Sequence, residues 1–370
     1  MGRGIPHIGI SAIATYEPPW ILGNDWFEGT IPRKFLQHTG TESRRVAVED
    51  ELTLAVRAVR SLQRETGCDL SDCAAIVFAS PSYVPLDVAR KYLDERGVRQ
   101  EHLPLAARHL ACRLGIATCP ALGINWFCSG YSKALAMVSR RMVPRLNLGR
   151  EQFVLVITSS RISRITDYSC QQSAALFGDL ATATLLARCD SRRYPLHFRL
   201  LHAHAHRRPV AKPFFEFHLR DNVLAPAVDG GRHYEPHRLV FSLDGMGIAE
   251  VAPRAMAGAI ADALAATGMP PEDVRFVLPH QAGTSIVRFT AMKVEEFGIR
   301  GEVLGDLTAR VGNVSSGSIP YSLRKAWLRL VGTIVCPTAA VGPPGVAEIS
   351  RGCVVLRATP RHERLARAAA

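Results

Sequence analysis

Residues 120–131 read Pro-Ala-Leu-Gly-Ile-Asn-Trp-Phe-Cys-Ser-Gly-Tyr, and this stretch indicates the fold. Its first part, Pro120 to Phe127, is typical of a short apolar strand, whereas apolar residues after Gly130 recur at helical spacing. Cys128 is therefore expected at a strand-to-helix turn. Unpaired N–H groups and the macrodipole at a helix start favour the thiolate, the nucleophilic form of cysteine. Taken alone, however, Cys128 is better explained as a buried structural cysteine.

Two later turns carry polar residues at comparable places. A strand expected over Val274–Leu278 leads into His280, and a helix is expected over Thr284–Phe297. Asn313 lies in a Gly/Ser-rich turn that precedes a helix expected to begin near Tyr321. Catalytic groups commonly occupy such turns. Each residue also has a structural explanation, His280 as a core histidine and Asn313 as a turn or capping residue, which would be preferred for each alone.

Together these segments resemble the thiolase superfamily, and most closely its β-ketoacyl-acyl-carrier-protein synthase III branch. The motifs that carry the resemblance are, in chain order, Ile8-Gly9-Ile10-Ser11 with Pro18-Pro19 and Asn24, Thr39-Gly40-Thr41-Glu42-Ser43-Arg44, Cys128-Ser129-Gly130-Tyr131, Phe177-Gly178-Asp179, Asp244-Gly245-Met246, His280-Gln281-Ala282 and Gly312-Asn313-Val314-Ser315. The resemblance implies an α/β, thiolase-like fold with two pseudo-duplicated halves in five α/β layers, usually as a homodimer. It implies an acyltransferase with Cys128, His280 and Asn313 as catalytic residues.

In that family the cysteine takes an acyl group from a thioester. A malonyl- or β-ketoacyl-thioester then undergoes decarboxylative Claisen condensation with it. Preorganised donors stabilise the enolate oxygen, and His280 and Asn313 are the residues expected to supply them. The backbone N–H of Cys128 is expected to serve the oxyanion of the acyl-transfer step. We expect thioesters of coenzyme A or an acyl carrier protein as partners, and neither a cofactor nor a metal.

Several positions depart from the synthase III pattern. Residues 33–38 lack the tryptophan that stacks on the adenine of coenzyme A, and Gln171 replaces an arginine. Gly283 takes the place of an asparagine, Ser285 that of a basic residue, and the Gly-rich loop over 342–348 is altered. These departures leave the nucleophile intact, and they favour a specialised polyketide-type or unusual-acyl pathway over ordinary fatty-acid biosynthesis.

Composition sets the wider limits. The chain has 370 residues, 47% of them hydrophobic, enough for one large core or two fused ones. No secretory leader or membrane-length apolar run is recognised, and the nine scattered cysteines read as reduced thiols, so a cytoplasmic protein is expected. The net charge of +12 suits anionic carriers, and arginines at 140, 141, 145, 150, 161 and 164 are expected to form a basic rim. No motif supports binding to nucleic acid or to a membrane.

We expect an N-terminal half over residues 1–188, a connecting segment over 189–234 and a C-terminal half over 235–360. Strands are expected near residues 8–13, 74–79, 121–127, 153–158, 181–187, 239–244, 274–278 and 353–358, and helices over 51–66, 131–142 and 251–267. In the connecting segment, His202, His204 and His206 could share one strand face and bind a metal, although a solvated face is favoured. Trp126 and Phe127 are expected to pack in the core. The tail from residue 361 is expected to fray.

Two further functions stay open at this point. The same fold could catalyse acyl transfer that forms an ester, an amide or another carbon–carbon bond without decarboxylation. Alternatively, the chain could be a partner subunit of a heterodimeric synthase, which the presence of the expected nucleophile argues against.

Overall fold

Alternating strands and helices build two similar half-sheets in the computed structural model, which describes residues 7–82, 103–236 and 238–369. The first half-sheet contains β1 (Ile8–Tyr16), β4 (Cys73–Ala79), β5 (Ala121–Ile124), β6 (Phe153–Ser160) and β7 (Leu180–Arg188). The second contains β8 (Phe198–Pro209), β13 (Val274–Val277), β14 (Glu302–Val303), β15 (Thr333–Val341) and β16 (Glu348–Ala358). Their strand orders are β1-β7-β6-β4-β5 and β8-β16-β15-β13-β14.

The two orders match strand for strand. In each half the first two neighbouring pairs are antiparallel and the last two are parallel. A short antiparallel contact between β1 and β8, with Ile10 opposite Phe198, joins the halves into one sheet in the described chain. This internal repeat agrees with the two pseudo-duplicated halves expected from the sequence.

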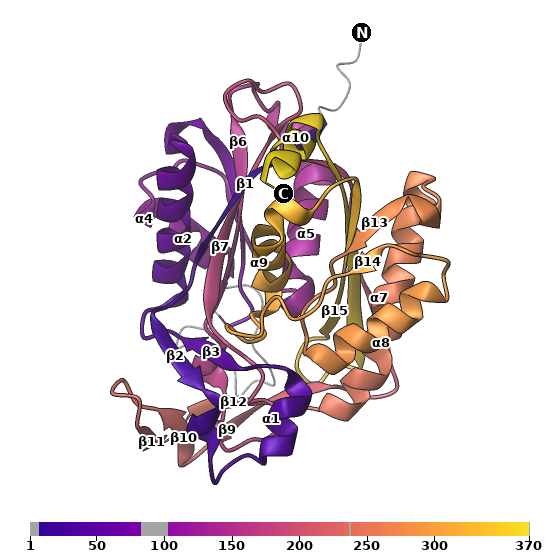
Figure 1. Ribbon diagram of the computed structural model, residues 1–370. Helices are drawn as coiled ribbons and strands as arrows, with labels where there is room; N and C mark the ends of the chain where they lie inside the picture. Colours follow the sequence, from indigo (N-terminus) through magenta and orange to yellow (C-terminus); the bar gives the residue numbers. More distant parts are fainter. Residues whose placement is uncertain (1–6, 83–102, 237, 370) are drawn as a thin grey trace.

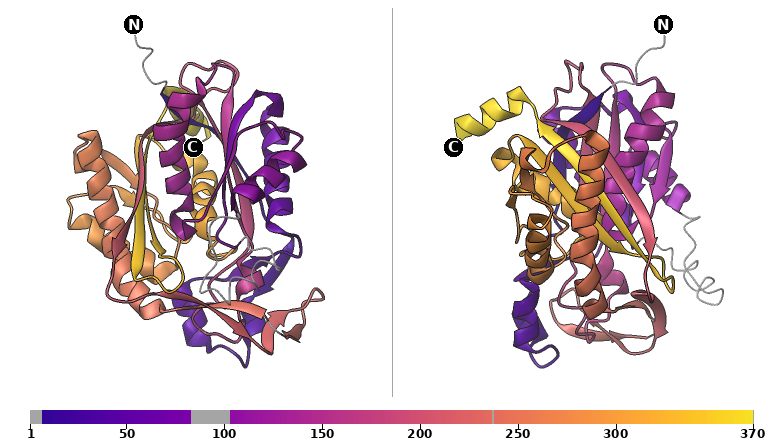
Figure 2. Two further views of the ribbon diagram at one scale, coloured as in Figure 1. Left: turned by 180° about the vertical axis from the view of Figure 1, so that it is seen from behind. Right: turned by 90° about the vertical axis from the view of Figure 1, so that its right-hand side faces the viewer.

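Helices complete five layers, as Figures 1 and 2 show. The outer face of the first half-sheet is covered by α2 (Glu51–Thr66) and α4 (Leu103–Arg113), and that of the second by α7 (Gly245–Thr267), beside which lies α8 (Thr284–Glu295). Between the half-sheets lie α5 (Gly130–Met137), its continuation through a π-helical turn (Val138–Met142) into α6 (Val143–Leu146), and α9 (Ser318–Lys325). The five-layer expectation is confirmed.

The middle layer holds the largest described core cluster, which joins the inner faces of both half-sheets. Tyr131 and Leu135 of α5 and Ile319 and Leu323 of α9 are buried in it. Both helices begin at the same end of the molecule, α5 directly after Cys128 and α9 shortly after Asn313. The apolar pattern of these helices therefore brings the separate turns that carry Cys128 and Asn313 to one place.

Smaller elements complete the described chain, and most of them lie around that end. They are β2 (Trp20–Gly23) with β3 (Ser43–Val46), β9 (Phe215–Arg220) with β12 (Arg238–Leu243), β10 (Val223–Pro226) with β11 (Arg232–Glu235), α1 (Arg33–Thr39), and the 3-10 turns Asn24–Phe27, Leu70–Asp72, Phe127–Ser129, Ile162–Ile165, Pro271–Asp273, Ser315–Gly317 and Trp327–Arg329. We propose that the half-sheets correspond to residues 1–188 and 235–360, and that the connecting segment supplies β8. Residues 1–6 and 83–102 of the first range lie outside the described part.

Three local expectations were wrong. The strand before Cys128 ends at Ile124, because the chain turns there into a 3-10 segment. The tail does not fray but forms α10 (Pro360–Ala369), whose His362 is fully buried. The three histidines of β8 do not form a solvated face, since only 2% of His204 is exposed and its ring stacks on His206 at 5.2 Å.

Candidate active site

Cys128 projects from a strained turn between β5 and α5. Phe127, the residue before it, has φ of +43°, a left-handed value that is costly for a bulky side chain. The Phe127 N–H donates to Oδ1 of Asn125 at 3.1 Å, which supports this conformation. Gly130 follows, and a Cβ there would lie 2.9 Å from the Cβ of Ser316. Position 130 therefore requires glycine, because a side chain there would prevent the loop that carries Asn313 from packing close to Cys128.

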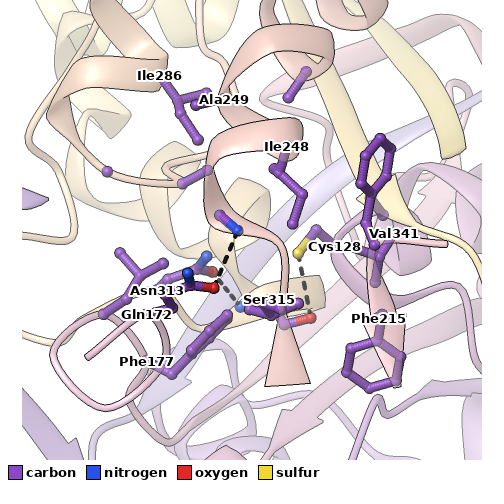
Figure 3. A pocket seen from close by; sticks show the side chains of 18 of the residues that line it. Cys128, Gln172, Phe177, Phe215, Ile248, Ala249, Ile286, Asn313, Ser315 and Val341 are labelled. Atoms are coloured by element: carbon purple, nitrogen blue, oxygen red, sulfur yellow. Dashed lines mark hydrogen bonds between the residues drawn. The ribbon is translucent and has the colours of Figure 1, made fainter. Parts of the chain in front are cut away.

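The three predicted catalytic residues line one cavity of about 550 Å³. Cys128 enters it from the β5–α5 turn, His280 from the segment after β13, and Asn313 from the loop before α9. Among the described lining residues none is a lysine, an arginine, an aspartate or a glutamate. Figure 3 shows Cys128 and Asn313 on either side of Ser315. Sequence motifs far apart in the chain therefore converge on a site without formal charge.

Asn313 is fixed through both its backbone and its side chain. Its N–H donates to the Leu176 carbonyl at 2.8 Å, and its own carbonyl accepts from the Gly178 N–H at 3.1 Å. Oδ1 accepts from the Ser315 N–H at 2.9 Å. This contact orients the amide, so that Nδ2 is the atom left with hydrogens to donate; within the described chain Nδ2 has no hydrogen-bond partner. The Phe-Gly-Asp turn thus fixes the position of the Asn313 amide, which is a neutral hydrogen-bond donor.

His280 is an uncharged imidazole. Only 2% of the residue is exposed, its backbone N–H donates to the Pro337 carbonyl at 2.9 Å, and burial lowers the pKa of the ring to about 3. Nδ1 is buried without a hydrogen-bond partner among the described residues. A buried orphan N–H is more costly than a buried lone pair, so the proton of the neutral ring belongs on Nε2. In that tautomer Nε2 is a hydrogen-bond donor.

Ser315 is a site residue that sequence reasoning missed, although it stood in the Gly-Asn-x-Ser motif. Its Oγ–H donates to Cys128 Sγ at 3.6 Å, and its φ is +49°. The same residue orients Asn313 through its N–H. The only sequence signal was the serine two places after the asparagine. Ser315 therefore links the Cys128 thiol to the Asn313 amide.

The expectation of a resting thiolate was wrong. Part of the Cys128 side chain faces the cavity, yet burial raises the pKa of the thiol to about 11, and the hydrogen bond from Ser315 opposes this shift only in part. The 3-10 turn Phe127–Ser129, which contains Cys128, places the sulfur in an apolar pocket that penalises the anion. Cys128 is consequently a neutral thiol near pH 7.

Two neighbours of Cys128 have different roles. Phe127 lines the cavity, with its ring 5.0 Å from that of Phe215, so the expectation that it packs only in the core was wrong. Trp126 instead packs against the middle-layer core and lies between two cations, Lys133 at 4.0 Å and Arg207 at 4.7 Å from its ring centre. The side chains of Trp126 and Phe127 thus lie on opposite sides of the turn.

Other motif residues form the scaffold of the site. The Asp179 carboxylate is fully buried and accepts hydrogen bonds from the N–H groups of Ala47 and Ser163; burial raises its pKa to about 6. Arg44 is also fully buried, and its Nε donates to the Ala175 carbonyl at 2.8 Å. Asp244 caps α7 by accepting from the Gly247 N–H. The side chains of Asp179, Arg44 and Asp244 hold loops in place and do not line the cavity, whereas Thr39, Phe177, Gly245 and Met246 of the same motifs do.

The mouth of the cavity contains the positions that depart from the synthase III pattern. Phe35, His38, Gln171 and Ser285 all line it. Gly283 has φ of +114°, and a Cβ there would lie 3.3 Å from the Thr39 carbonyl, so this backbone requires glycine. The arginines at 140, 141, 145, 150, 161 and 164 do not line the cavity itself, and the basic rim expected around it stays a prediction.

No metal centre emerges from the described residues, in which no group of three histidine, cysteine, aspartate or glutamate side chains is placed to hold an ion. Over the same residues no helix is both long and apolar enough to cross a bilayer.

Comparison with known proteins agrees with this geometry. Residues 122–205 match the family model of 3-oxoacyl-[acyl-carrier-protein] synthase III, and residues 264–331 match that of its C-terminal domain. β-Ketoacyl-[acyl-carrier-protein] synthase III of Rhodobacter capsulatus is 27% identical over 358 residues, which cover 94% of this chain and 98% of the relative. The enzyme of that name from Rhodospirillum centenum is 28% identical over 322 residues, covering 86% and 89%.

Solved structures share the fold at lower identity. Synthase III from Aquifex aeolicus aligns with a TM-score of 0.67 and 21% identity, covering 95% of this chain and 99% of that one. AbyA1, a tetronic acid condensing enzyme, aligns with a TM-score of 0.67 and 18% identity, covering 94% and 99%. The fold and the family matches together support a condensing enzyme of the thiolase superfamily. Within that superfamily, the chain is similar to β-ketoacyl-acyl-carrier-protein synthase III.

Proposed function

We propose that the protein catalyses acyl transfer from a thioester to Cys128, followed by decarboxylative condensation with a malonyl- or β-ketoacyl-thioester, with Cys128, His280 and Asn313 as its catalytic residues. The observation that carries the proposal is the convergence of these residues in one uncharged cavity, with Asn313 oriented by Ser315. The synthase III relatives support the same reaction.

In the first step the Cys128 sulfur attacks the donor carbonyl. A sulfur–carbon bond forms, the bond to the carrier thiol breaks, and the thiol proton leaves with the released carrier. The backbone N–H of Cys128 is the proposed donor to the transient oxyanion. Because the resting thiol is neutral, no buried charge has to be maintained between turnovers.

In the second step the carboxylate of the extender leaves as carbon dioxide, and its bonding electrons form an enolate. Asn313 Nδ2 and His280 Nε2 are the proposed donors to the enolate oxygen. The enolate carbon attacks the acyl group, a carbon–carbon bond forms, and the Cys128 thiolate departs and takes a proton from solvent. A cavity lined without cations leaves the carboxylate poorly solvated before it is lost, which favours decarboxylation.

We propose thioesters of an acyl carrier protein or coenzyme A as substrates, a homodimer as the working form, and the cytoplasm as its location. A role in polyketide-type biosynthesis is supported by another structural neighbour, the priming β-ketosynthase of the R1128 polyketide pathway. Simple acyl transfer without decarboxylation is the second candidate, because the uncharged mouth would also admit a neutral acceptor.

Intact-mass measurement tests the proposal. The protein is incubated with acyl-coenzyme A and acyl-carrier thioesters, and an adduct absent in Cys128→Ala is expected. Malonyl thioester added to the acyl-enzyme should then release carbon dioxide. Acylation without release under any malonyl donor would favour simple transfer, and no adduct from any donor would favour a non-catalytic partner subunit.

A further inference from the structure

One wall of the cavity consists of short apolar side chains from α7 and from the two strands that it covers. The residues of this wall are Ile248, Ala249, Ala252 and Met256 of α7, Ala339 and Ala340 of β15, and Ile349 of β16. The α7 positions follow the spacing of a single helix face. Four of the seven are alanines, which fill little of the space between a helix and a sheet. We call this part of the cavity the alanine arm.

The opposite wall is of another kind. Phe127 and Phe215 meet edge to face at 5.0 Å, and Phe215 and Phe241 lie 5.6 Å apart. These rings therefore pack against one another. Figure 3 shows Ile248 and Ala249 on one side of Cys128, with Phe215 and Val341 on the other. Open space next to the nucleophile thus has a bulky aromatic wall on one side and an alkyl wall of small residues on the other.

Polar groups are absent from the alanine arm and gather elsewhere in the described lining. Gln171, Gln172 and Ser285 lie among the mouth residues, and His280 and Asn313 are the catalytic donors. A pantetheine arm carries two amides, and each amide buried unpaired against alkyl groups would lose its hydrogen bonds to water without replacement. The glutamines and the serine can pair with such amides, whereas the alanine arm can receive only hydrocarbon.

The arm also has a measurable depth. At the surface end of α7, Met246 is 80% exposed, whereas Met256 is completely buried. The eight residue steps from Ile248 to Met256 span about 12 Å along the helix axis. An extended alkyl chain advances about 1.25 Å per carbon–carbon bond, so roughly nine bonds fit in that length.

We propose that the alanine arm binds the hydrocarbon chain of a medium-length acyl thioester, of about octanoyl to dodecanoyl size, and that Met256 closes its far end. The inference rests on the proposed function, because the chain in the arm is that of the acyl group carried by Cys128. It assigns the substrate class as saturated, unsubstituted acyl groups longer than acetyl. Ala252 and Met256 then determine specificity by volume and take no part in the chemistry.

Acylation of Cys128 by acetyl, octanoyl, dodecanoyl and hexadecanoyl thioesters, followed by intact mass, tests this assignment. The wild type should acylate faster with octanoyl or dodecanoyl than with acetyl. In Ala252→Leu, the ratio of the dodecanoyl to the acetyl rate should fall about tenfold, because the added methyl groups occupy the arm. Ala255→Leu, the same change on the same helix at a partly buried position outside the cavity lining, should leave the ratio unchanged.

Met256→Ala provides the opposite change. It should raise the hexadecanoyl rate relative to octanoyl about threefold or more, and it remains informative if Ala252→Leu does not fold. A wild type that prefers acetyl, or ratios that Ala252→Leu and Met256→Ala leave unchanged, would overturn the proposed arm while leaving the condensing function intact. Absence of any adduct that depends on Cys128 would instead overturn the proposed function itself, and the arm with it.

Discussion

At the scale of single residues, the protonation state of Cys128 is the property that most affects reactivity. Burial raises its thiol pKa to about 11, so the thiolate fraction should keep rising well above the usual cysteine range. We expect the rate of alkylation by iodoacetamide at Cys128, followed by peptide mass, to increase with pH beyond pH 9. An inflection below pH 8 would show instead that the start of α5 stabilises the thiolate more than burial penalises it.

Ser315 and Asn313 should affect different chemical steps, although they touch each other. Asn313→Ala removes the donor to the enolate oxygen, so carbon dioxide release from the acyl-enzyme should fall about 100-fold to 1,000-fold while acylation of Cys128 falls much less. Ser315→Ala keeps the N–H that orients Asn313 and loses the hydroxyl at Cys128 Sγ. It should therefore slow acylation more than decarboxylation. Equal losses in both steps for both variants would contradict these separate roles.

At the scale of elements, the sequence predicted the strongly periodic segments well and their ends less well. The helix over Glu51–Thr66 was predicted with its observed bounds, because Asp50 caps it and Gly67 ends it in a left-handed conformation. The strand before Cys128 was predicted too long, since the apolar residues Trp126 and Phe127 continue the pattern into a turn. Periodicity reports burial, and both residues are partly buried without belonging to a strand.

The candidate site, too, was predicted from the sequence only in part. Cys128, His280 and Asn313 lie in recognisable turns, and the structure brings them to one cavity. The role of Ser315 and the alanine arm could not be predicted, because each depends on which elements face one another across the fold. The pKa of Cys128 was misjudged for a related reason: helix starts can be read from the sequence, whereas the apolar surroundings that oppose the thiolate come from β9, β12 and β15.

The C-terminal helix α10 is an element whose contribution can be measured. His362 is fully buried, its ring centre lies 4.4 Å from that of Phe198, and its Nε2 lies 2.9 Å from the Trp327 carbonyl. His362→Ala should lower the free energy of unfolding by about 2–4 kcal/mol, through the cavity and the unpaired carbonyl that it leaves. Arg364→Ala, on the exposed face of the same helix, should change it by less than about 0.5 kcal/mol. Urea denaturation followed by circular dichroism measures both, and equal small effects would mean that the helix is not anchored.

At the scale of the whole molecule, buried neutral histidines should make the fold sensitive to acid. Burial lowers the pKa of His280 to about 3, and of His197, His202 and His204 to about 4, from an ordinary value of 6.5. Between pH 6.5 and 4 the unfolded chain therefore binds more protons at these positions than the folded chain, so stability must fall as the pH falls. Asp179, whose pKa burial raises to about 6, and Glu51, whose pKa burial also raises, act in the opposite direction over part of this window, but they are two groups against four.

The midpoint of urea denaturation should accordingly drop between pH 7 and pH 5. The decrease should be smaller in His204→Gln, which removes one buried titrating ring with an unpaired Nε2 while keeping a polar side chain of similar length. His218→Gln is the matched control, since that ring is partly exposed and already has Ser242 Oγ at 2.8 Å. A midpoint that is constant over this range, or a decrease that His204→Gln leaves unchanged, would show that the folded protein accepts protons at these histidines without cost. A midpoint that does not change with pH would also bear on function. It would mean that His280 can become protonated inside the cavity, whereas its proposed role as a neutral donor requires an uncharged ring.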